Sequence, residues 1–457
     1  MEAQRVAMSQ PDMVRLAAGI GRMSWWQGVA TIAAGSSLVV IPLVLTAHPG
    51  TRYGIPFPVL LRSSFGINGA HIPALLRALV ACGWCGIETW IGGQTIALLL
   101  PFDRQSWYSH RLSWLGTSPL DITCFFIFML CQLALIWKGM AHIRRIQNYS
   151  APVLIILTGA LFYWAYHTAG GFGDMLSLPS RKFWPIFLPS LTASAANWSG
   201  LALNISDFSR YARSQTSQIT GQLGLPLFMA AYCFAGLAIA SATETIFGRV
   251  ISDPVELLRE IGGVGTAIVA LFGISLAIVT TNIPANLVAP ANFLVSLRPG
   301  TFSFARGAAA TALVSVAFLP WKILGSSESF VYTWLVGYSM VLGPITGIMI
   351  VDYYVLRGMV LDVKGLYSGS PVGRYYYWGG YNVAALVALV VAVVLAVPGF
   401  LHKAGVVETT PGMFVAIYDN AWLFGIFCGG LVYWVLSCGR ELGKGREGEP
   451  LAESLNP

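Results

Sequence analysis

The sequence predicts an all-α protein that crosses a membrane many times. Of its 457 residues, 56% are hydrophobic and only 10% are charged, whereas soluble domains carry about 25% charged residues. Stretches of roughly 20 mainly apolar residues, the length that spans a bilayer, recur along the whole chain. So few polar residues cannot cover a water-exposed surface, and lipid is therefore the expected solvent.

Apolar length predicts about eleven spans, and we interpret residues 1–457 as a single polytopic membrane domain. With the C-terminus in the cytoplasm, most Lys and Arg residues of the connections face that side, and residues 438–457 form a polar cytoplasmic tail. The expected spans cover residues 24–47, 75–100, 120–140, 149–169, 184–206, 222–246, 263–297, 305–322, 329–356, 378–400 and 415–437.

Charge and cysteine usage exclude several classes of protein. The net charge is +7, but the basic residues lie between apolar runs and form no patch, so no nucleic-acid partner is expected. Cys82 and Cys85 form a CxxC pair without a second Cys or His pair to complete a metal site. The six His residues are scattered and no nucleophile–base pair is evident. We therefore expect neither an enzyme nor a cofactor.

A carboxylate lies in the middle of the span over 75–100. On a helix, Arg77, Trp84, Glu88, Ile91 and Thr95 fall on one stripe. Because an ionisable group at mid-membrane is costly, Glu88 is a candidate functional residue. The alternatives are a structural Glu paired with a neighbouring helix and a Trp84 that only packs the core.

Small and polar residues interrupt the span over 184–206. Ser194, Asn197, Ser199 and Gly200 cluster around Trp198, and such residues weaken helix through local hydrogen bonds or low propensity. We expect a discontinuous helix whose freed backbone groups line a cavity or protein. The alternative is an unbroken helix that packs closely through its small residues.

A third polar stretch surrounds a proline in the span over 263–297. Thr280, Thr281, Asn282 and Asn286 flank Pro284, which removes a backbone hydrogen bond and frees a carbonyl. Oxygen ligands of this kind suit hard cations. The alternative is that the threonine hydroxyls bond back to their own helix.

Seven stretches, in this order, make the chain resemble the nucleobase–cation symporter-1 family of permeases for hydantoins, allantoin, cytosine, uracil and purines. The form of the stretch around Glu88 is most similar to the plant-like nucleobase branch. The stretches are Ser24-Trp-Trp-Gln27, Tyr53-Gly-Ile-Pro-Phe-Pro58, Arg62-Ser-Ser-Phe-Gly66, Gly83-Trp-Cys-Gly-Ile-Glu-Thr89, Asn204-Ile-Ser-Asp-Phe-Ser-Arg-Tyr211, Asn282-Ile-Pro-Ala-Asn286 and Gly343-Pro-Ile-Thr-Gly347-Ile-Met-Ile-Val-Asp352-Tyr-Tyr354.

The resemblance implies an inverted-repeat transporter fold of five plus five helices, with two extra C-terminal helices. The first helix is expected to be truncated, with residues 1–23 as its remnant. The family binds its substrate at mid-membrane between broken helices. We expect a monomer in the bilayer of a cell or of a plastid envelope.

The resemblance also implies roles for individual residues. The family stacks a planar ring between two tryptophans, which match Trp84 and Trp198, and binds the ring edge with residues matching Glu88 and Asn286. Asn282 is a reserve substrate ligand. The sodium-binding members use residues that match Ala277, Thr280 and Thr281.

Together these features predict a cation-coupled symporter for nucleobases or related planar heterocycles, such as uracil, purines, cytosine or allantoin. The coupling ion is a proton or sodium. Burial disfavours the charged form of a carboxyl, so Glu88 is also the candidate proton-coupling group. The alternative function is an inactive or truncated member that binds without transport; a channel and a membrane enzyme are less compatible with the pattern.

Overall fold

The computed structural model describes residues 23–100, 110–138, 140–176, 183–298, 300–324 and 333–441. Their regular structure is helical apart from two isolated β-bridges, which confirms the predicted class. Nine helices among the described residues are long and apolar enough to cross a membrane, and the chain is a multi-pass integral membrane protein. They cover Trp25–Tyr53, His71–Ala97, Pro119–Trp137, Arg145–Ala169, Gln215–Phe247, Val264–Leu297, Thr333–Leu356, Val383–Lys403 and Ala421–Cys438.

The two other expected spans are not single long helices. The segment over 184–206 is divided into α8 (Trp184–Asn197), α9 (Ser199–Asn204) and α10 (Ser206–Ser209), so the predicted discontinuous helix is confirmed. The segment over 305–322 forms the shorter α16 (Phe304–Ala317) and then α17 (Pro320–Ile323). The expected remnant of the first helix and most of the predicted tail lie outside the described residues.

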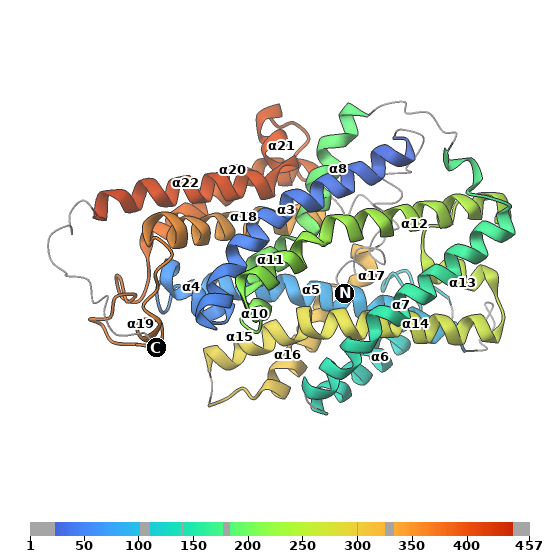
Figure 1. Ribbon diagram of the computed structural model, residues 1–457, viewed down its shortest axis with the longest axis horizontal. Helices are drawn as coiled ribbons and strands as arrows, with labels where there is room; N and C mark the ends of the chain where they lie inside the picture. Colours follow the sequence, from blue (N-terminus) through green and yellow to red (C-terminus); the bar gives the residue numbers. More distant parts are fainter. Residues whose placement is uncertain are drawn as a thin grey trace.

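Helix α5 (His71–Ala97), which carries Glu88, runs through the middle of the helical body (Figure 1). It packs against α6, α14, α15 and α16 and has the largest buried share of the nine spans. The other helices are α3 (Trp25–Tyr53), α4 (Phe57–Phe65), α6 (Pro119–Trp137), α7 (Met140–Ala169), η2 (Gly173–Leu176), α11 (Gln215–Leu223), α12 (Leu225–Phe247), α13 (Pro254–Ile261), α14 (Val264–Asn282), η3 (Ile283–Val288), α15 (Ala289–Leu297), α18 (Val336–Ile350), η5 (Val351–Leu356), α19 (Val363–Leu366), α20 (Val383–Lys403), α21 (Gly412–Asp419) and α22 (Ala421–Glu441).

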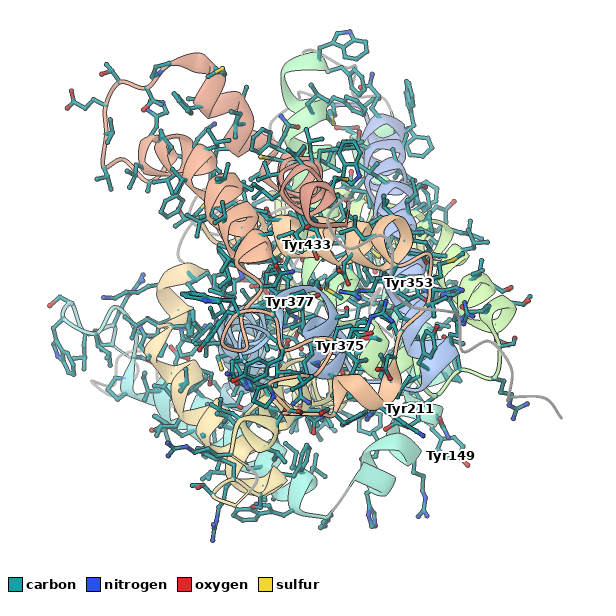
Figure 2. The ribbon with its side chains drawn as sticks, turned by 90° about the vertical axis from the view of Figure 1, so that its left-hand side faces the viewer. Tyr149, Tyr211, Tyr353, Tyr375, Tyr377 and Tyr433 are labelled. Atoms are coloured by element: carbon teal, nitrogen blue, oxygen red, sulfur yellow. The ribbon has the colours of Figure 1, made fainter. Side chains whose placement is uncertain are left out.

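A buried ion pair fixes one end of this body. Arg357 Nε donates to Asp352 Oδ2 at 2.8 Å, and Tyr433 of α22 donates to Asp352 Oδ1 at 2.8 Å. The Arg357 guanidinium also donates to the Ser63 carbonyl of α4 at 2.7 Å. Tyr377 donates to that same carbonyl, and Figure 2 shows Tyr377 and Tyr433 at the end of the molecule that faces the viewer. Paired in this way, the charges tie η5 to α4 and α22.

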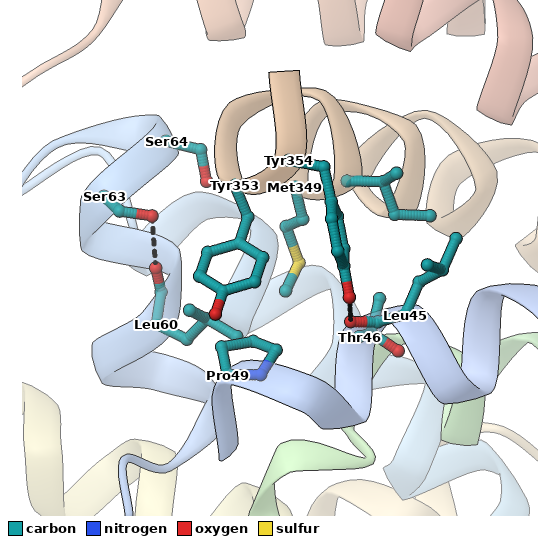
Figure 3. Close-up of a pocket in the computed structure, with 10 residues that line it drawn as sticks. Leu45, Thr46, Pro49, Leu60, Ser63, Ser64, Met349, Tyr353 and Tyr354 are labelled. Carbon is teal, nitrogen blue, oxygen red and sulfur yellow. Dashed lines mark hydrogen bonds between the residues drawn. The ribbon is translucent and has the colours of Figure 1, made fainter. Parts of the chain in front are cut away.

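Segment η5 is also held against α3. The Tyr354 hydroxyl donates to the Leu45 carbonyl at 3.0 Å (Figure 3). The Tyr353 hydroxyl lies 2.9 Å from His48 Nδ1. A cavity of about 10 Å³, also lined by Thr46, remains between these helices. That volume is close to what one water molecule needs, so the contact is nearly dry.

Helix α14 continues after Asn282 into the π-helical segment η3, whose second residue is Pro284. Because proline has no N–H, the carbonyl of Thr280, four residues earlier, loses its helical donor. Gln147 of α7 replaces it, with Nε2 donating to the Thr280 carbonyl at 3.2 Å. The predicted disruption is therefore present, and a neighbouring helix satisfies the freed carbonyl, as hydrocarbon surroundings require.

Replacing Gln147→Leu should destabilise the protein by about 1–3 kcal/mol, since the Thr280 carbonyl would lose its donor in an apolar interior. In a Pro284→Ala background the same substitution should cost less, because the introduced alanine has an N–H that can serve this carbonyl. The measurement is the melting temperature of the purified protein in detergent. An equal loss in both backgrounds would contradict this account of the interruption.

Candidate functional site

The carboxyl group of Glu88 lies where α5 meets the interruption of α14. Its side chain is 5% exposed. Thr281 Oγ1 donates to Glu88 Oε2 at 2.9 Å, and Asn286 Nδ2 donates to Glu88 Oε1 at 3.3 Å. The structure thus brings together three of the residues that the sequence singled out, one before and one after Pro284, around a single carboxyl group.

Asn282 links the amide of Asn286 to a glutamine of the neighbouring helix α6. Its Oδ1 accepts from Asn286 Nδ2 at 3.0 Å, and its Nδ2 donates to Gln132 Oε1 of α6 at 2.9 Å. Gln132 Nε2 in turn donates to Thr89 Oγ1 at 2.9 Å. Because the Asn282 side chain is engaged by protein groups on both sides, its geometry suits a residue that positions Asn286.

Trp84 lies one helical turn before Glu88 and is surrounded by aromatic rings. Its ring centroid is 6.3 Å from that of Trp334 and 6.4 Å from that of Tyr338, both in edge-on arrangements. Gly83 permits the approach of Trp334, since a Cβ at that position would clash with Trp334 Cη2. Trp84 therefore belongs to an aromatic cluster between α5 and the start of α18.

Trp198 occupies the break between α8 and α9 and is 3% exposed. It packs in a different apolar cluster from Trp84, together with Ala202, Met229 and other residues. Tyr338 connects the two regions, because its hydroxyl donates to the Ala196 carbonyl of α8 at 3.1 Å. The predicted stacking of a ring between Trp84 and Trp198 stays a prediction.

Three buried polar atoms of these residues have no hydrogen-bond partner among the described residues. They are the indole Nε1 atoms of Trp198 and Trp334 and Oδ1 of Asn286. An unpaired buried donor or acceptor costs free energy, so each such group in a protein asks for an explanation. Two donors and one acceptor without partners suit a ligand that carries both kinds of group.

The expected cation ligands lie together on α14, but their hydroxyls bond to the helix itself. Thr280 Oγ1 donates to the Leu276 carbonyl at 2.8 Å, and Thr281 Oγ1 lies 2.9 Å from the Ala277 carbonyl. This is the alternative arrangement that the sequence left open. The oxygens suit a hard cation in type, but among the described residues they approach from one helix only.

Ala277 also borders a groove of about 560 Å³ between α7, α12, α13 and α14. The groove is mainly apolar, with Thr158, Tyr232 and Ser252 among its few polar residues. Of the predicted cation ligands, Ala277 therefore borders this groove, whereas Thr281 contacts Glu88.

Sequence reasoning missed four residues of the site: Gln132, Gln147, Trp334 and Tyr338. Gln132 is a polar residue in an otherwise apolar helix, a signal that the sequence did offer. Gln147 offered none, because it lies among polar and basic residues just before the expected span over 149–169. The two aromatic residues carried no such signal, because aromatic residues are common throughout this chain and only the packing of α18 against α5 selects them.

The arrangement suits binding more than covalent chemistry. Aromatic faces, an amide and a carboxyl group converge on interrupted helices, a combination that fits a flat ring with polar edges. Within the described ranges, no group of three or more His, Cys, Asp or Glu residues could hold a metal ion.

Comparison with known proteins agrees with this geometry. Residues 12–425 match the family described as permeases for cytosine/purines, uracil, thiamine and allantoin. The chain is 56% identical over 440 residues to the purine-uracil permease of Arabidopsis thaliana, covering 95% of this chain and 73% of that protein. It is 35% identical to the allantoin permease of Bacillus subtilis, covering 91% of this chain and 84% of that protein.

A solved structure of Mhp1, a nucleobase-cation-symport-1 family transporter in a closed conformation with bromovinylhydantoin bound, has the same fold. It superposes with a TM-score of 0.72 at 25% identity, covering 97% of this chain and 91% of that one. The overlay confirms the expected inverted-repeat transporter fold, while the truncation of the first helix stays a prediction. The chain belongs to the family of membrane permeases for cytosine and purines, uracil, thiamine and allantoin.

Proposed function

We propose that this protein is a cation-coupled symporter that carries a nucleobase, with uracil and purines as the first candidates and cytosine and allantoin as further ones. The observation that carries the proposal is the buried carboxyl group of Glu88, held by Thr281 and Asn286 one turn from Trp84. The similarity to a purine-uracil permease supports the choice of substrate.

Each part of such a substrate has a counterpart in the site. The faces of the ring would stack on Trp84 and Trp198. Asn286 Oδ1, which has no partner among the described residues, would accept an N–H of the ring. Glu88 would bind a neighbouring edge group, because a carboxyl accepts hydrogen bonds when ionised and also donates one when protonated.

The interrupted helices fit a mechanism in which the site opens to each side of the membrane in turn. In transporters of this architecture, the substrate binds between broken helices at mid-membrane while one group of helices moves relative to the other. The break at Trp198 and the π-helical segment after Asn282 meet this requirement. No covalent step is needed, which agrees with membership of a transporter family.

The test is uptake of radiolabelled uracil by the purified protein in proteoliposomes, with unlabelled adenine, guanine, cytosine, allantoin and hydantoin as competitors. Saturable uptake that a subset of these compounds inhibits is the expected result. Binding without uptake would instead support an inactive member, and uptake that does not saturate would indicate a channel.

The coupling ion is a proton carried by Glu88 or a sodium ion at Ala277, Thr280 and Thr281. Each threonine hydroxyl donates its hydrogen to a neighbouring oxygen, so the lone pairs of its own oxygen stay available to a sodium ion. Uptake in sodium-free choline buffer separates the two ions, since full activity there would discard sodium as the coupling ion.

Trp84→Ala and Trp198→Ala should each weaken uracil binding by about ten- to a hundredfold. The reason is the loss of one stacking face, which is worth about 1–3 kcal/mol for a base on an aromatic ring. The measurement is the apparent affinity of uptake, compared at equal amounts of protein in the membrane.

Trp90→Ala is the matched control, because Trp90 lies on the same helix with the same exposure but packs against Trp321 and Phe125. It should lower stability and leave the affinity unchanged. If Trp334→Ala weakened uracil binding and Trp198→Ala did not, the second stacking face would be Trp334, just before α18. That result would refute the predicted pair of Trp84 and Trp198.

Glu88→Gln should keep substrate binding but uncouple uptake from the pH gradient. Glutamine offers a donor and an acceptor much as a protonated carboxyl does, but it cannot take up and release a proton. With external acidification the natural protein should accumulate more uracil, whereas the variant should only equilibrate it. Uptake against external pH in proteoliposomes is the measurement.

Glu244→Gln on α12 makes the same change of charge at an exposed position and should retain the natural pH dependence. Accumulation against a gradient by Glu88→Gln, with the pH dependence of the natural protein, would leave Glu88 only its role in binding the substrate.

A further inference from the structure

A buried arginine contacts both interrupted helices. Arg77 lies on α5, about 16 Å along the helix axis from Glu88, and is 4% exposed. Its Nε donates to the Gly200 carbonyl of α9 at 2.9 Å, and its Nη2 donates to the Ala285 carbonyl of η3 at 3.4 Å. One side chain therefore reaches the backbone just after each break.

The guanidinium group is suited to this contact in a way that an ammonium group is not. It presents several N–H donors in a rigid planar fork, whereas lysine carries all its donors on one atom. Because Gly200 has no side chain, the guanidinium group can approach its backbone. A Cβ at this position would lie 3.5 Å from Arg77 Cζ. Arg77 thus lies flat against the first turn of α9.

The positive charge of Arg77 is linked to a buried carboxylate through an amide. Arg77 Nε lies 3.3 Å from Asn204 Oδ1, and Asn204 Nδ2 donates to Asp207 Oδ2 at 3.3 Å. Asp207 Oδ1 accepts from the Phe57 N–H at the start of α4, at 2.9 Å. A buried charge is tolerated in a membrane protein when it is paired in this manner.

The contact with η3 lies directly beside the proposed substrate site. Ala285, whose carbonyl binds Arg77, precedes Asn286, whose amide binds Glu88. Helix α5 therefore holds two consecutive residues of the π-helical segment, with Arg77 at one and Glu88 at the other. The contact with Gly200 lies two residues after Trp198.

We propose that Arg77 is a positioning residue that fixes the two helix breaks relative to each other, and with them Trp198 and Asn286. The role in substrate binding rests on the proposed function, but the mechanical link between the breaks does not. Loss of the guanidinium group should increase local opening of the backbone at both breaks together. The two breaks are far apart in the sequence and belong to different helices.

The first test is amide hydrogen exchange of the ligand-free protein, which does not depend on any substrate. Arg77→Lys should raise exchange by at least about tenfold at residues 198–204 and at residues 283–288, on the scale of a lost charged hydrogen bond. Arg62→Lys is the matched control, because Arg62 donates to the single carbonyl of Leu366, which a lysine can also reach.

Increased exchange at only one of the two segments, or at neither, would overturn the link. Arg77→Gln serves as a second variant, and it should behave like Arg77→Lys. Failure of both Arg77 variants to fold, with Arg62→Lys folded normally, would also overturn the proposal in favour of a purely structural arginine.

The second test asks whether Arg77 acts through Asn286, with radiolabelled uracil as the probe. Arg77→Lys and Asn286→Ala should each weaken binding about tenfold, and the double variant should be little weaker than either, because coupled sites are not additive. Losses that multiply to about a hundredfold would overturn action through Asn286. Absence of uracil binding in the natural protein would refute the proposed substrate, and hydrogen exchange would still decide the link.

Discussion

The absence of water from the hydrocarbon core constrains every interrupted helix of this protein. A backbone carbonyl that loses its helical donor there must find another, because an unpaired group costs several kcal/mol in lipid. Gln147 serves the carbonyl freed by Pro284, and Arg77 donates to the carbonyls of Gly200 and Ala285 beside the two breaks. Polar side chains on α5 and α7, buried for Arg77 and half-buried for Gln147, thus support two helices that are broken inside the membrane.

The same requirement places the groups that would bind a substrate. Asn286 is held at its amide by Asn282 and Glu88, which leaves its oxygen without a partner among the described residues. Gln132 holds Asn282 from α6. Gln132 thus positions Asn282, and Asn282 positions the acceptor oxygen of Asn286. Preorganisation of this kind lowers the entropy cost of binding.

The sequence predicts which residue types form the site better than it predicts which of them are in contact. Glu88, Thr281 and Asn286 are recognisable because polar residues are rare in apolar spans, and the proline between the last two indicates a break. Their convergence depends on how α14 crosses α5, which no local pattern encodes. The sequence likewise shows Arg77 only as a residue on the same helix face as Glu88. It does not indicate that the partners of Arg77 lie on α9 and η3. The aromatic neighbours of Trp84 likewise come from α18, far along the chain.

The contact between Thr281 and Glu88 bears on the choice of coupling ion. Thr281 Oγ1 lies 2.9 Å from a carboxyl oxygen of Glu88 and 2.9 Å from the Ala277 carbonyl. A sodium ion bound by Thr281 would therefore lie close to Glu88, and a nearby positive charge favours the ionised carboxylate. A proton on Glu88 would remove that negative charge and weaken sodium binding. The two ions would thus oppose each other's binding, so one site of this geometry is suited to a single coupling ion.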